Sequence, residues 1–396
     1  MTIKQHIETE LVFDGDDNHD PYGAVVPPVY QNSLFTFDSW EALEQAFADK
    51  ENSVIYTRGN NPSVQYTENK LALLAGGEKA KLFSSGMAAV SAGILHFLSQ
   101  GDHLITVSNI YGPTATLIRD MLIPKMGVEV TYVTGHCLDE IMEAIRPNTK
   151  LIYLESPSSV VFSLQDIAQI SLLAKAHNIN TMIDNTWATP LYQKPLALGI
   201  DLEMHSCTKY LGGHSDIISG VLIGSQSLIN KISMKEYELL GATSSPNDAS
   251  MLLRSLRTLP IRMERHQQSA MRIANFLNDH EKIAEVFYPG LSSFTQSSLA
   301  AQQMTGYSGL FSFKLQTDNL VLIKRFFNAL TLFQKGVSWG GHESLIYAPA
   351  ISCSVEQTPE HMKRMGLSFS NMRVSIGLEN VDDLIADLTQ ALAKIE

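Results

Sequence analysis

The stretch TMIDNTWATPLYQKPLALGIDLEMHSCTKYLGGHSD, residues 181–216, decides the fold because it brings an acid and a lysine to two expected strand ends. An apolar run ends at Asp184, and a second short segment, 201–207, leads directly to Lys209. Ligands of open α/β sheets bind at the carboxyl ends of the strands. The stretch therefore predicts one sheet edge that carries both side chains.

This pair of side chains has a chemical interpretation and a plain one. An acid that can face a ring nitrogen, with a lysine amine nearby, is what a pyridoxal 5'-phosphate (PLP) site requires. The same residues also suit a helix-capping aspartate and a surface lysine in a glycine-rich turn. The stretch alone does not separate the two, so the rest of the chain has to.

Helix and strand patterns alternate from residue 61 to about residue 255. This alternation is typical of βαβ units and of a mostly parallel sheet in an α/β fold. The expected helices are 63–75, 87–99 and 163–178, and the expected strands are 103–107, 128–133, 150–155, 179–184 and 220–225. We interpret 61–255 as one large domain.

The pattern changes at about residue 256. A long helix is expected at 260–280, strands at 309–315 and 371–378 with a helix at 319–329 between them, and a final helix at 380–396. Residues 256–396 are therefore predicted to form a smaller α/β or α+β domain.

Residues 1–60 carry little periodic pattern. They include an acidic segment, 14–21, and one helical pattern at 39–51. A segment with so little core of its own usually packs on something else. We predict that it is an arm that contacts a neighbouring subunit.

The composition excludes several classes of protein. A net charge of −12 disfavours nucleic acids and anionic membranes as partners, because both need a basic surface. The three cysteines form no CxxC pair, no leader pattern opens the chain, and no apolar run reaches the roughly 20 residues of a membrane span. His205, Cys207 and His214 match no standard zinc spacing, so no metal is expected. We expect a cytoplasmic enzyme.

Other candidate residues lie in loops, and each has a plain alternative. The segment 84–87 precedes an apolar helix, whose N-terminus could bind a phosphate group or be an ordinary serine-capped start. Tyr111 could stack on a planar ring or simply pack in its turn. Arg58, close to Tyr56, could grip a phosphate group or be solvated.

Two candidates lie in the C-terminal part. Arg373 alternates with the apolar side chains of its strand, so it faces either a substrate carboxylate or a wet surface. Trp339 stands among the glycines of 336–344, which suits a loop that approaches a ligand closely or a turn anchored by a buried tryptophan.

Taken in order, these segments resemble the PLP-dependent transsulfuration family, the fold type I enzymes of cysteine and methionine metabolism. The motifs that carry the resemblance across nearly the whole chain are YTRGNNPS, FSSGMAA, YGPT, ESPSS, MIDNTWATP, SCTKYLGGHSD, SLRTLPIR, SWGGHESL and RVSIGLENVDDL. The resemblance implies a mostly parallel seven-stranded sheet in the large domain, PLP as cofactor, and a homotetramer of dimers that share active sites.

The resemblance also implies roles. Lys209 would hold PLP covalently and later move protons, Asp184 would pair with the ring nitrogen, and Tyr111 would stack on the ring. The residues expected to bind the phosphate group are Gly86, Met87, Ser206 and Thr208, joined by Tyr56 and Arg58 of a neighbouring subunit. The residues expected at the substrate are Arg373, which would bind the α-carboxylate, and Ser338 and Trp339, which would line the pocket.

Within the family, the chain is similar to the β-lyase branch that acts on cystathionine. Trp187, Ser159 and Trp339 carry this likeness. Val337 departs from the tyrosine expected in the closest β-lyases and from the glutamate typical of γ-enzymes that act on cystathionine.

The implied reaction is α,β-elimination from L-cystathionine to homocysteine, pyruvate and ammonia, as in methionine biosynthesis. A methionine γ-lyase, a cysteine desulfhydrase and a thiol-adding sulfhydrylase of the same family stay open. A PLP-fold protein kept for regulation would not need Lys209, Asp184, Tyr111 and Arg373 together. A dehydrogenase would need a glycine-rich fingerprint that the chain lacks.

Overall fold

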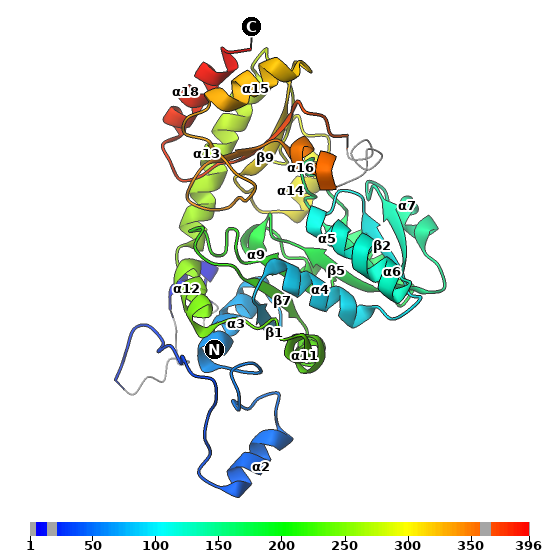
Figure 1. The fold of residues 1–396 in the computed structure, drawn as a ribbon, viewed down its shortest axis with the longest axis vertical. Helices are drawn as coiled ribbons and strands as arrows, with labels where there is room; N and C mark the ends of the chain where they lie inside the picture. The colour runs from blue at the N-terminus through cyan, green and yellow to red at the C-terminus, as the bar shows by residue number, and fades with distance from the viewer. Residues whose placement is uncertain (1–4, 14–21, 357–365, 396) are drawn as a thin grey trace.

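The computed structural model describes residues 5–13, 22–356 and 366–395. The acidic segment 14–21 and the last residue of the final expected helix therefore lie outside the described residues. Two sheets with their helices follow one another along the long axis, with the arm that carries α2 (Trp40–Ala48) at one end and the C-terminus at the other (Figure 1).

A seven-stranded sheet forms the larger body, with the strand order β1-β7-β6-β5-β4-β2-β3. The strands are β1 (Lys79–Phe83), β2 (His103–Val107), β3 (Glu129–Val133), β4 (Thr149–Glu155), β5 (Asn180–Asp184), β6 (Leu202–Ser206) and β7 (Gly220–Gly224). The ladder from β3 to β6 is parallel, whereas β7 runs antiparallel to both β6 and β1. The predicted mostly parallel seven-stranded sheet is confirmed.

The first strand was not among the strands expected from the sequence. Two lysines interrupt its apolar pattern, and Lys81 is nevertheless buried. Its ammonium donates to the carbonyl oxygen of Gly59 at 3.0 Å and lies 3.4 Å from Glu68. Because lysine is rarely buried, a strand that contains a buried and paired lysine is not recognised from the hydrophobic pattern of the sequence.

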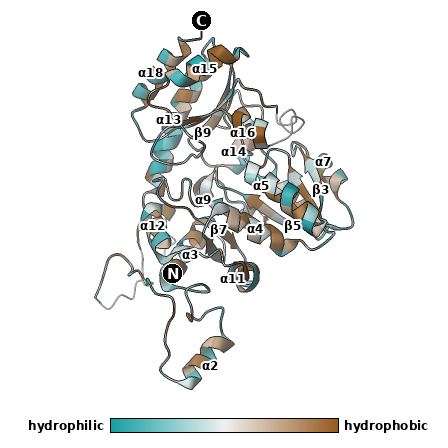
Figure 2. Cartoon of the chain, viewed as in Figure 1, coloured by the Kyte–Doolittle hydropathy of each residue, from teal (hydrophilic) through white to brown (hydrophobic). Residues whose placement is uncertain are grey.

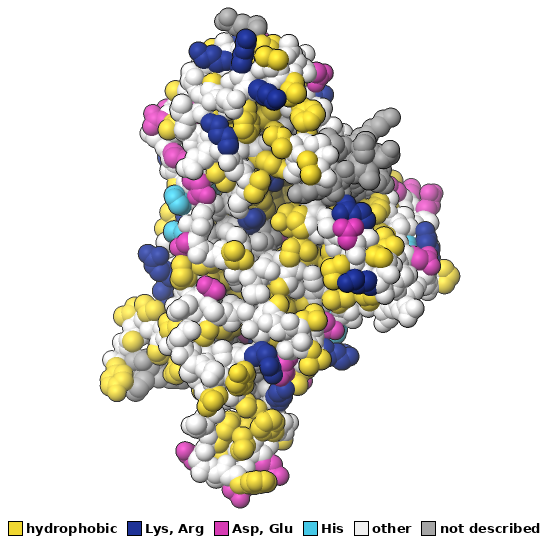
Figure 3. Space-filling view, viewed as in Figure 1, with side chains coloured by type: hydrophobic (Ala, Val, Ile, Leu, Met, Phe, Trp, Pro, Cys, Tyr) yellow, Lys and Arg dark blue, Asp and Glu magenta, His cyan; other side chains and the backbone are white. Residues whose placement is uncertain are grey.

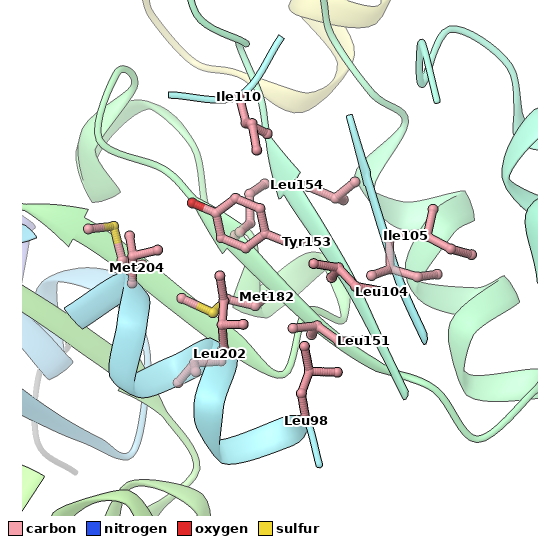
Figure 4. Close-up of a cluster of buried hydrophobic side chains, with 14 of the residues drawn as sticks. Leu98, Leu104, Ile105, Ile110, Leu151, Tyr153, Leu154, Met182, Leu202 and Met204 are labelled. Carbon is pink, nitrogen blue, oxygen red and sulfur yellow. The ribbon is translucent and has the colours of Figure 1, made fainter. Parts of the chain in front are cut away.

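Apolar side chains fill the space between this sheet and its helices. Figure 4 shows part of this core, with labelled side chains from β2, β4, β5 and β6, from the residue that follows α4 (Gly86–Phe97), and from the loop after β2. The labelled residues are Leu98, Leu104, Ile105, Ile110, Leu151, Tyr153, Leu154, Met182, Leu202 and Met204, all fully or nearly buried. Parallel strands that are buried on both faces read as continuous apolar runs, which is why the sequence revealed them.

Several helices around the large sheet have side-chain caps, and α3 is the clearest example. Asn61 accepts a hydrogen bond from the backbone N–H of Ser63 at 3.0 Å where α3 begins, and α3 ends at Gly76 with φ of 76°. The helices are α3 (Pro62–Ala75), α4, α5 (Gly112–Leu117), α6 (Ile123–Met126), α7 (Leu138–Ala144), α8 (Ile167–Ala176), α9 (Thr189–Tyr192), α10 (Gln226–Ile232), α11 (Glu238–Leu240) and α12 (Pro246–Leu256).

A five-stranded sheet with the order β10-β11-β12-β9-β8 forms the second body. Its strands are β8 (Ile283–Phe287), β9 (Leu310–Leu315), β10 (Gln334–Lys335), β11 (Leu345–Tyr347) and β12 (Asn371–Ser375). Its helices are α13 (Leu259–Asn278), α14 (Ser297–Gln303), α15 (Leu320–Ala329), α16 (Pro349–Glu356) and α18 (Val381–Leu392). Along α13 and α18, hydrophilic and hydrophobic residues alternate as in amphipathic helices (Figure 2). The boundary predicted at 255/256 falls at the end of α12, and the division into domains stays a prediction.

The arm has little core of its own. Helix α1 (Ile7–Val12) buries Leu11 among residues of α3, but α2 projects from the body (Figure 1). Trp40 on α2 is 78% exposed, and Leu43 and Phe47 on the same helix are also exposed. Hydrophobic side chains gather on this projecting part (Figure 3). Such a surface motivates the predicted contact with a neighbouring subunit.

Candidate active site

A cavity of about 250 Å³ opens where the carboxyl ends of β4, β5 and β6 face loops of the second sheet. The sequence-predicted site residues that line it are Gly86, Met87, Tyr111, Asp184, Ser206, Thr208, Lys209, Trp339 and Arg373. Residues from strand ends, a helix start and the C-terminal sheet thus meet in one place. The arrangement agrees with the rule that α/β sheets bind ligands at the carboxyl edge.

Lys209 reaches into the cavity from the turn after β6. Its Nζ donates to Ser338 Oγ at 3.0 Å and lies 5.5 Å from the centre of the Trp339 ring. Burial and the Arg373 cation lower the pKa of Lys209 to about 8, and the Asp184 charge opposes this shift. A lysine with this pKa has a neutral amine available near physiological pH, as a nucleophile or a general base requires.

Asp184 ends β5, as the sequence predicts. Its Oδ1 accepts hydrogen bonds from the backbone N–H of Thr186 at 2.9 Å and from the hydroxyl of the same residue. Burial raises the pKa of Asp184, and these hydrogen bonds act against that shift. Because both bonds end on Oδ1 within the described part of the chain, Oδ2 can pair with a cationic group in the cavity.

Glu155 is a second buried acid, at the end of the neighbouring strand and in register with Asp184. It accepts hydrogen bonds from the backbone N–H of Tyr111 at 2.6 Å and from Ser159 Oγ at 2.5 Å. Burial, followed by the Asp184 charge, raises the pKa of Glu155 to about 8. Two adjacent carboxyls resist ionising together, so the negative charge of Asp184 adds to the effect of burial in raising the pKa of Glu155.

The start of α4 and the end of β6 are packed closely together. The Ser85 side chain accepts from the backbone N–H of Ala88 at 3.1 Å and caps the helix. A Cβ on Gly86 would lie only 2.9 Å from the Cβ of Ser206. Backbone N–H groups at a helix N-terminus and nearby hydroxyls form an anion-binding concavity.

Arg373 lies in the cavity and not on a wet face of β12. Its Nη2 donates to the carbonyl oxygen of Val337, and its guanidinium stands 4.8 Å from the centre of the Tyr347 ring. Burial lowers the pKa of Arg373 to about 10, so it is a cation at neutral pH. A guanidinium at this place can bind a carboxylate with two parallel hydrogen bonds.

Three predicted residues do not line the cavity. Ser338 touches it only through its bond to Lys209. Tyr56 and Arg58 line a separate pocket between the arm and the large-sheet body, where Arg58 Nη2 lies 3.8 Å from Glu238. Neither residue lines the Lys209 cavity of the same chain, and the role toward a neighbouring subunit stays a prediction.

Comparisons with known proteins agree with this geometry. A model of the family described as Cys/Met metabolism PLP-dependent enzyme matches residues 8–393. The chain belongs to this family. L-methionine gamma-lyase from Pseudomonas deceptionensis is 42% identical over 386 residues, 97% of this chain and 96% of that protein.

Two further relatives show how broad the family is. Cystathionine beta-lyase from Lactococcus lactis subsp. cremoris is 37% identical over 389 residues, 98% of this chain and 99% of that protein. A crystal structure of cystathionine gamma synthase from Xanthomonas oryzae pv. oryzae in complex with cystathionine has a TM-score of 0.93 at 32% identity, with 99% of both chains covered. The fold is therefore that of fold type I PLP enzymes, and the chain is a PLP-dependent carbon–sulfur lyase.

The cavity fits PLP on its own geometry. The helix start at Gly86 with the hydroxyls of Ser206 and Thr208 suits a phosphate group, although Thr208 Oγ1 already accepts from the backbone N–H of Ser219 at 3.1 Å. Asp184 and Lys209 line the same cavity, where the acid would suit a ring nitrogen and the amine a covalent attachment. Burial raises the pKa of Asp184, and a cationic ring nitrogen beside it would stabilise the carboxylate and lower that pKa again.

Sequence reasoning missed Glu155, Thr186 and Tyr347. Glu155 could have been found, because the expected strand 150–155 ends on an acid just as 179–184 does. Thr186 also could have been found, because an Asp side chain commonly accepts a hydrogen bond from the backbone N–H two residues later. Tyr347 gave no signal, since only the fold brings it against Arg373.

The structure also shows the surroundings of His205 and His214, which were considered as metal ligands. Among the described residues, no group of three or more His, Cys, Asp or Glu side chains could hold a metal ion. His205 instead pairs with buried Glu203 at 2.7 Å, and His214 Nδ1 lies 2.7 Å from the carbonyl oxygen of Gly212. In the ranges that the structure covers, no helix has the length and hydrophobicity to span a membrane.

Proposed function

We propose that this enzyme cleaves the Cβ–S bond of L-cystathionine by α,β-elimination, which yields homocysteine, pyruvate and ammonia. The observation that carries the elimination chemistry is the meeting of Lys209, Asp184 and Arg373 in one buried cavity. The preference for β-cleavage rests on Trp187, Ser159 and Trp339, which resemble the β-lyase branch and all line that cavity.

Arg373 and Asp184 would each have a separate role in this reaction. Arg373 binds the α-carboxylate and so fixes the amino acid with its Cα near Lys209. PLP, when bound, supplies a protonated ring that takes up the negative charge left at Cα. Asp184 keeps the proton on the ring nitrogen. Each unit by which Asp184 raises the pKa of the ring nitrogen stabilises the protonated ring by about 1.4 kcal/mol.

Lys209 would then move the protons. Its neutral amine removes the proton from Cα, and the electron pair forms a Cα–Cβ double bond as the Cβ–S bond breaks. The sulfur leaves with the electron pair of the broken bond and receives a proton from the Lys209 ammonium. Water converts the three-carbon product into pyruvate and ammonia.

The surrounding residues would support these steps. Gly86, Met87, Ser206 and Thr208 would hold the cofactor phosphate, and Tyr111 would stack on its ring. Ser338 would steady the Lys209 amine through their hydrogen bond. We further propose a cytoplasmic homotetramer that serves methionine biosynthesis, in which Arg58 completes the site of a neighbour.

Methionine γ-lyase activity is the second candidate. A relative with that name shares 42% identity with this chain. Val337, beside Arg373, is 71% exposed and offers an apolar surface to the distal part of a substrate. Methionine ends in an apolar methyl group, whereas cystathionine ends in a second charged amino acid.

The keto acid that forms decides between the two. Purified, PLP-loaded enzyme is assayed in parallel with cystathionine, methionine and cysteine. Pyruvate with homocysteine from cystathionine, and little product from methionine, supports the proposal. α-Ketobutyrate from methionine in excess of pyruvate from cystathionine would overturn it in favour of γ-cleavage.

A further inference from the structure

Tyr347 and Arg373 are direct partners across two antiparallel strands. In the pairing of β11 with β12, Tyr347 stands opposite Arg373. Residues directly opposite in such a pair project to the same face, with Cβ atoms about 5 Å apart. The strand register itself therefore delivers the ring to the guanidinium.

The contact between them is specific. The Cζ of Arg373 lies 4.8 Å from the centre of the Tyr347 ring, which is the geometry of a cation–π interaction. The phenol oxygen is hydrogen-bonded to Ser352 Oγ on α16, so the ring is held at its far end as well. The ring therefore presents a fixed, half-buried face to the cation.

The guanidinium is held at a second point. Arg373 Nη2 donates to the carbonyl oxygen of Val337, which belongs to the loop that also carries Ser338 and Trp339. Within the described ranges this is its only hydrogen bond. The Tyr347 ring thus covers one face of the guanidinium, and one Nη2 N–H group binds the Val337 carbonyl oxygen. The remaining N–H groups can donate hydrogen bonds to a ligand in the cavity.

We propose that Tyr347 is a positioning residue, whose ring holds the Arg373 guanidinium ready for the α-carboxylate of an amino-acid substrate. An arginine side chain that is already ordered loses less conformational freedom when it binds. A bidentate bond also requires the plane of the fork to match the carboxylate. The inference rests on the proposed role of Arg373.

Four variants test it: Tyr347→Leu, Tyr347→Phe, Ser352→Ala and Arg373→Leu. The leucine variant removes the ring but keeps an apolar residue in β11. The phenylalanine variant keeps the ring and loses only the hydroxyl, and Ser352→Ala removes the same hydrogen bond from the other side. The dissociation constant of glycine, followed by absorbance titration of the bound cofactor, is measured beside KM, kcat, PLP content and the melting temperature.

We expect Tyr347→Leu to raise the dissociation constant and KM about tenfold, the effect of losing a partly desolvated cation–π contact. kcat and PLP content should stay within about twofold of wild type, because Lys209 and Asp184 are untouched. Tyr347→Phe and Ser352→Ala should bind glycine almost as well as wild type. Rescue by phenylalanine separates a role of the ring from a general loss of stability.

The outcomes distinguish the inference from the proposed function. If Arg373→Leu weakens glycine binding but Tyr347→Leu does not, Tyr347 has no positioning role and the proposed function stands. If Tyr347→Phe binds as poorly as Tyr347→Leu, the ring face is not what orients Arg373, and the inference is wrong. If Arg373→Leu binds glycine normally, the carboxylate site itself has been misplaced.

Discussion

At the scale of single residues, the site depends on how buried charges set one another's pKa. Burial has the largest effect on the pKa of Lys209 and lowers it, the Arg373 cation lowers it further, and the Asp184 anion raises it. The neutral form of its amine is favoured because an ammonium loses hydration in the cavity and is repelled by the guanidinium. The amine is therefore prepared for reaction before any ligand arrives.

This balance predicts a pH dependence. Only the neutral amine attacks the cofactor aldehyde, so covalent attachment of PLP to the apoenzyme should accelerate as the pH rises through about 8. Arg373→Leu removes a charge that lowers the pKa of Lys209, so the midpoint should move to higher pH. Asp184→Asn removes a charge that raises the same pKa, so the midpoint should move to lower pH.

The measurement is the attachment rate by stopped-flow absorbance across this pH range. A midpoint at the ordinary lysine pKa of about 10.4 would show that the cavity does not tune Lys209. A midpoint that both variants leave in place would show that the two charges do not act on it.

Replacement of Lys209 should separate chemistry from folding. We predict that Lys209→Ala lowers kcat for cystathionine by at least about 10²-fold, since a positioned general base contributes roughly 10² to 10⁴. Lys150→Ala, an exposed lysine on β4, serves as the matched control and should keep its turnover. Turnover of Lys209→Ala near that of wild type would remove this lysine from the mechanism.

At the scale of elements, the proposed site for the cofactor phosphate depends on how closely α4 approaches β6. Gly86→Ala would place a Cβ 2.9 Å from Ser206, so the helix start and Ser206 must separate. We predict weaker PLP binding, seen as a higher dissociation constant in equilibrium dialysis. Gly112→Ala at the start of α5 meets nothing within 4 Å and is the control. Equal PLP affinity in both variants would contradict the assignment of the phosphate to α4.

The sequence predicts the strands that are long enough to show a clear pattern of buried residues. Strand β2 is buried at every position and β5 at its three central positions, and the sequence places both almost to the residue. Strands β10 and β11 were not found, because two and three residues carry no periodic signal. Asp184 and Lys209 could be predicted from their positions at a sheet edge. Tyr347 could not, because its contact with Arg373 depends on a strand register that only the folded chain defines.

At the scale of the whole molecule, the arm exposes apolar surface and keeps two predicted site residues away from the Lys209 cavity. Tyr56 and Arg58 lie in a pocket apart from the Lys209 cavity, and α2 exposes apolar side chains to solvent. An arm that docks on a second copy would cover this surface and could deliver Arg58 to the neighbour's cofactor phosphate. This is the proposal of shared active sites.

Subunit mixing tests that proposal. Arg58→Ala and Lys209→Ala should each be poorly active alone. After unfolding and refolding together in equal amounts, about a quarter of the sites should be intact, because each hybrid dimer has one site with both wild-type residues. No recovery of activity in the mixture would place Arg58 and Lys209 in the same chain's site or remove Arg58 from it.

The central claim is that PLP is bound to Lys209 in the cavity at the carboxyl edge of the large sheet. The most direct test reduces the PLP-loaded enzyme with borohydride, which makes the bond between cofactor and lysine permanent, and then locates the added mass by peptide mapping. We predict that the pyridoxyl group is found on the peptide that contains Lys209. Stoichiometric labelling of another lysine, such as Lys81 or Lys194, would contradict the account.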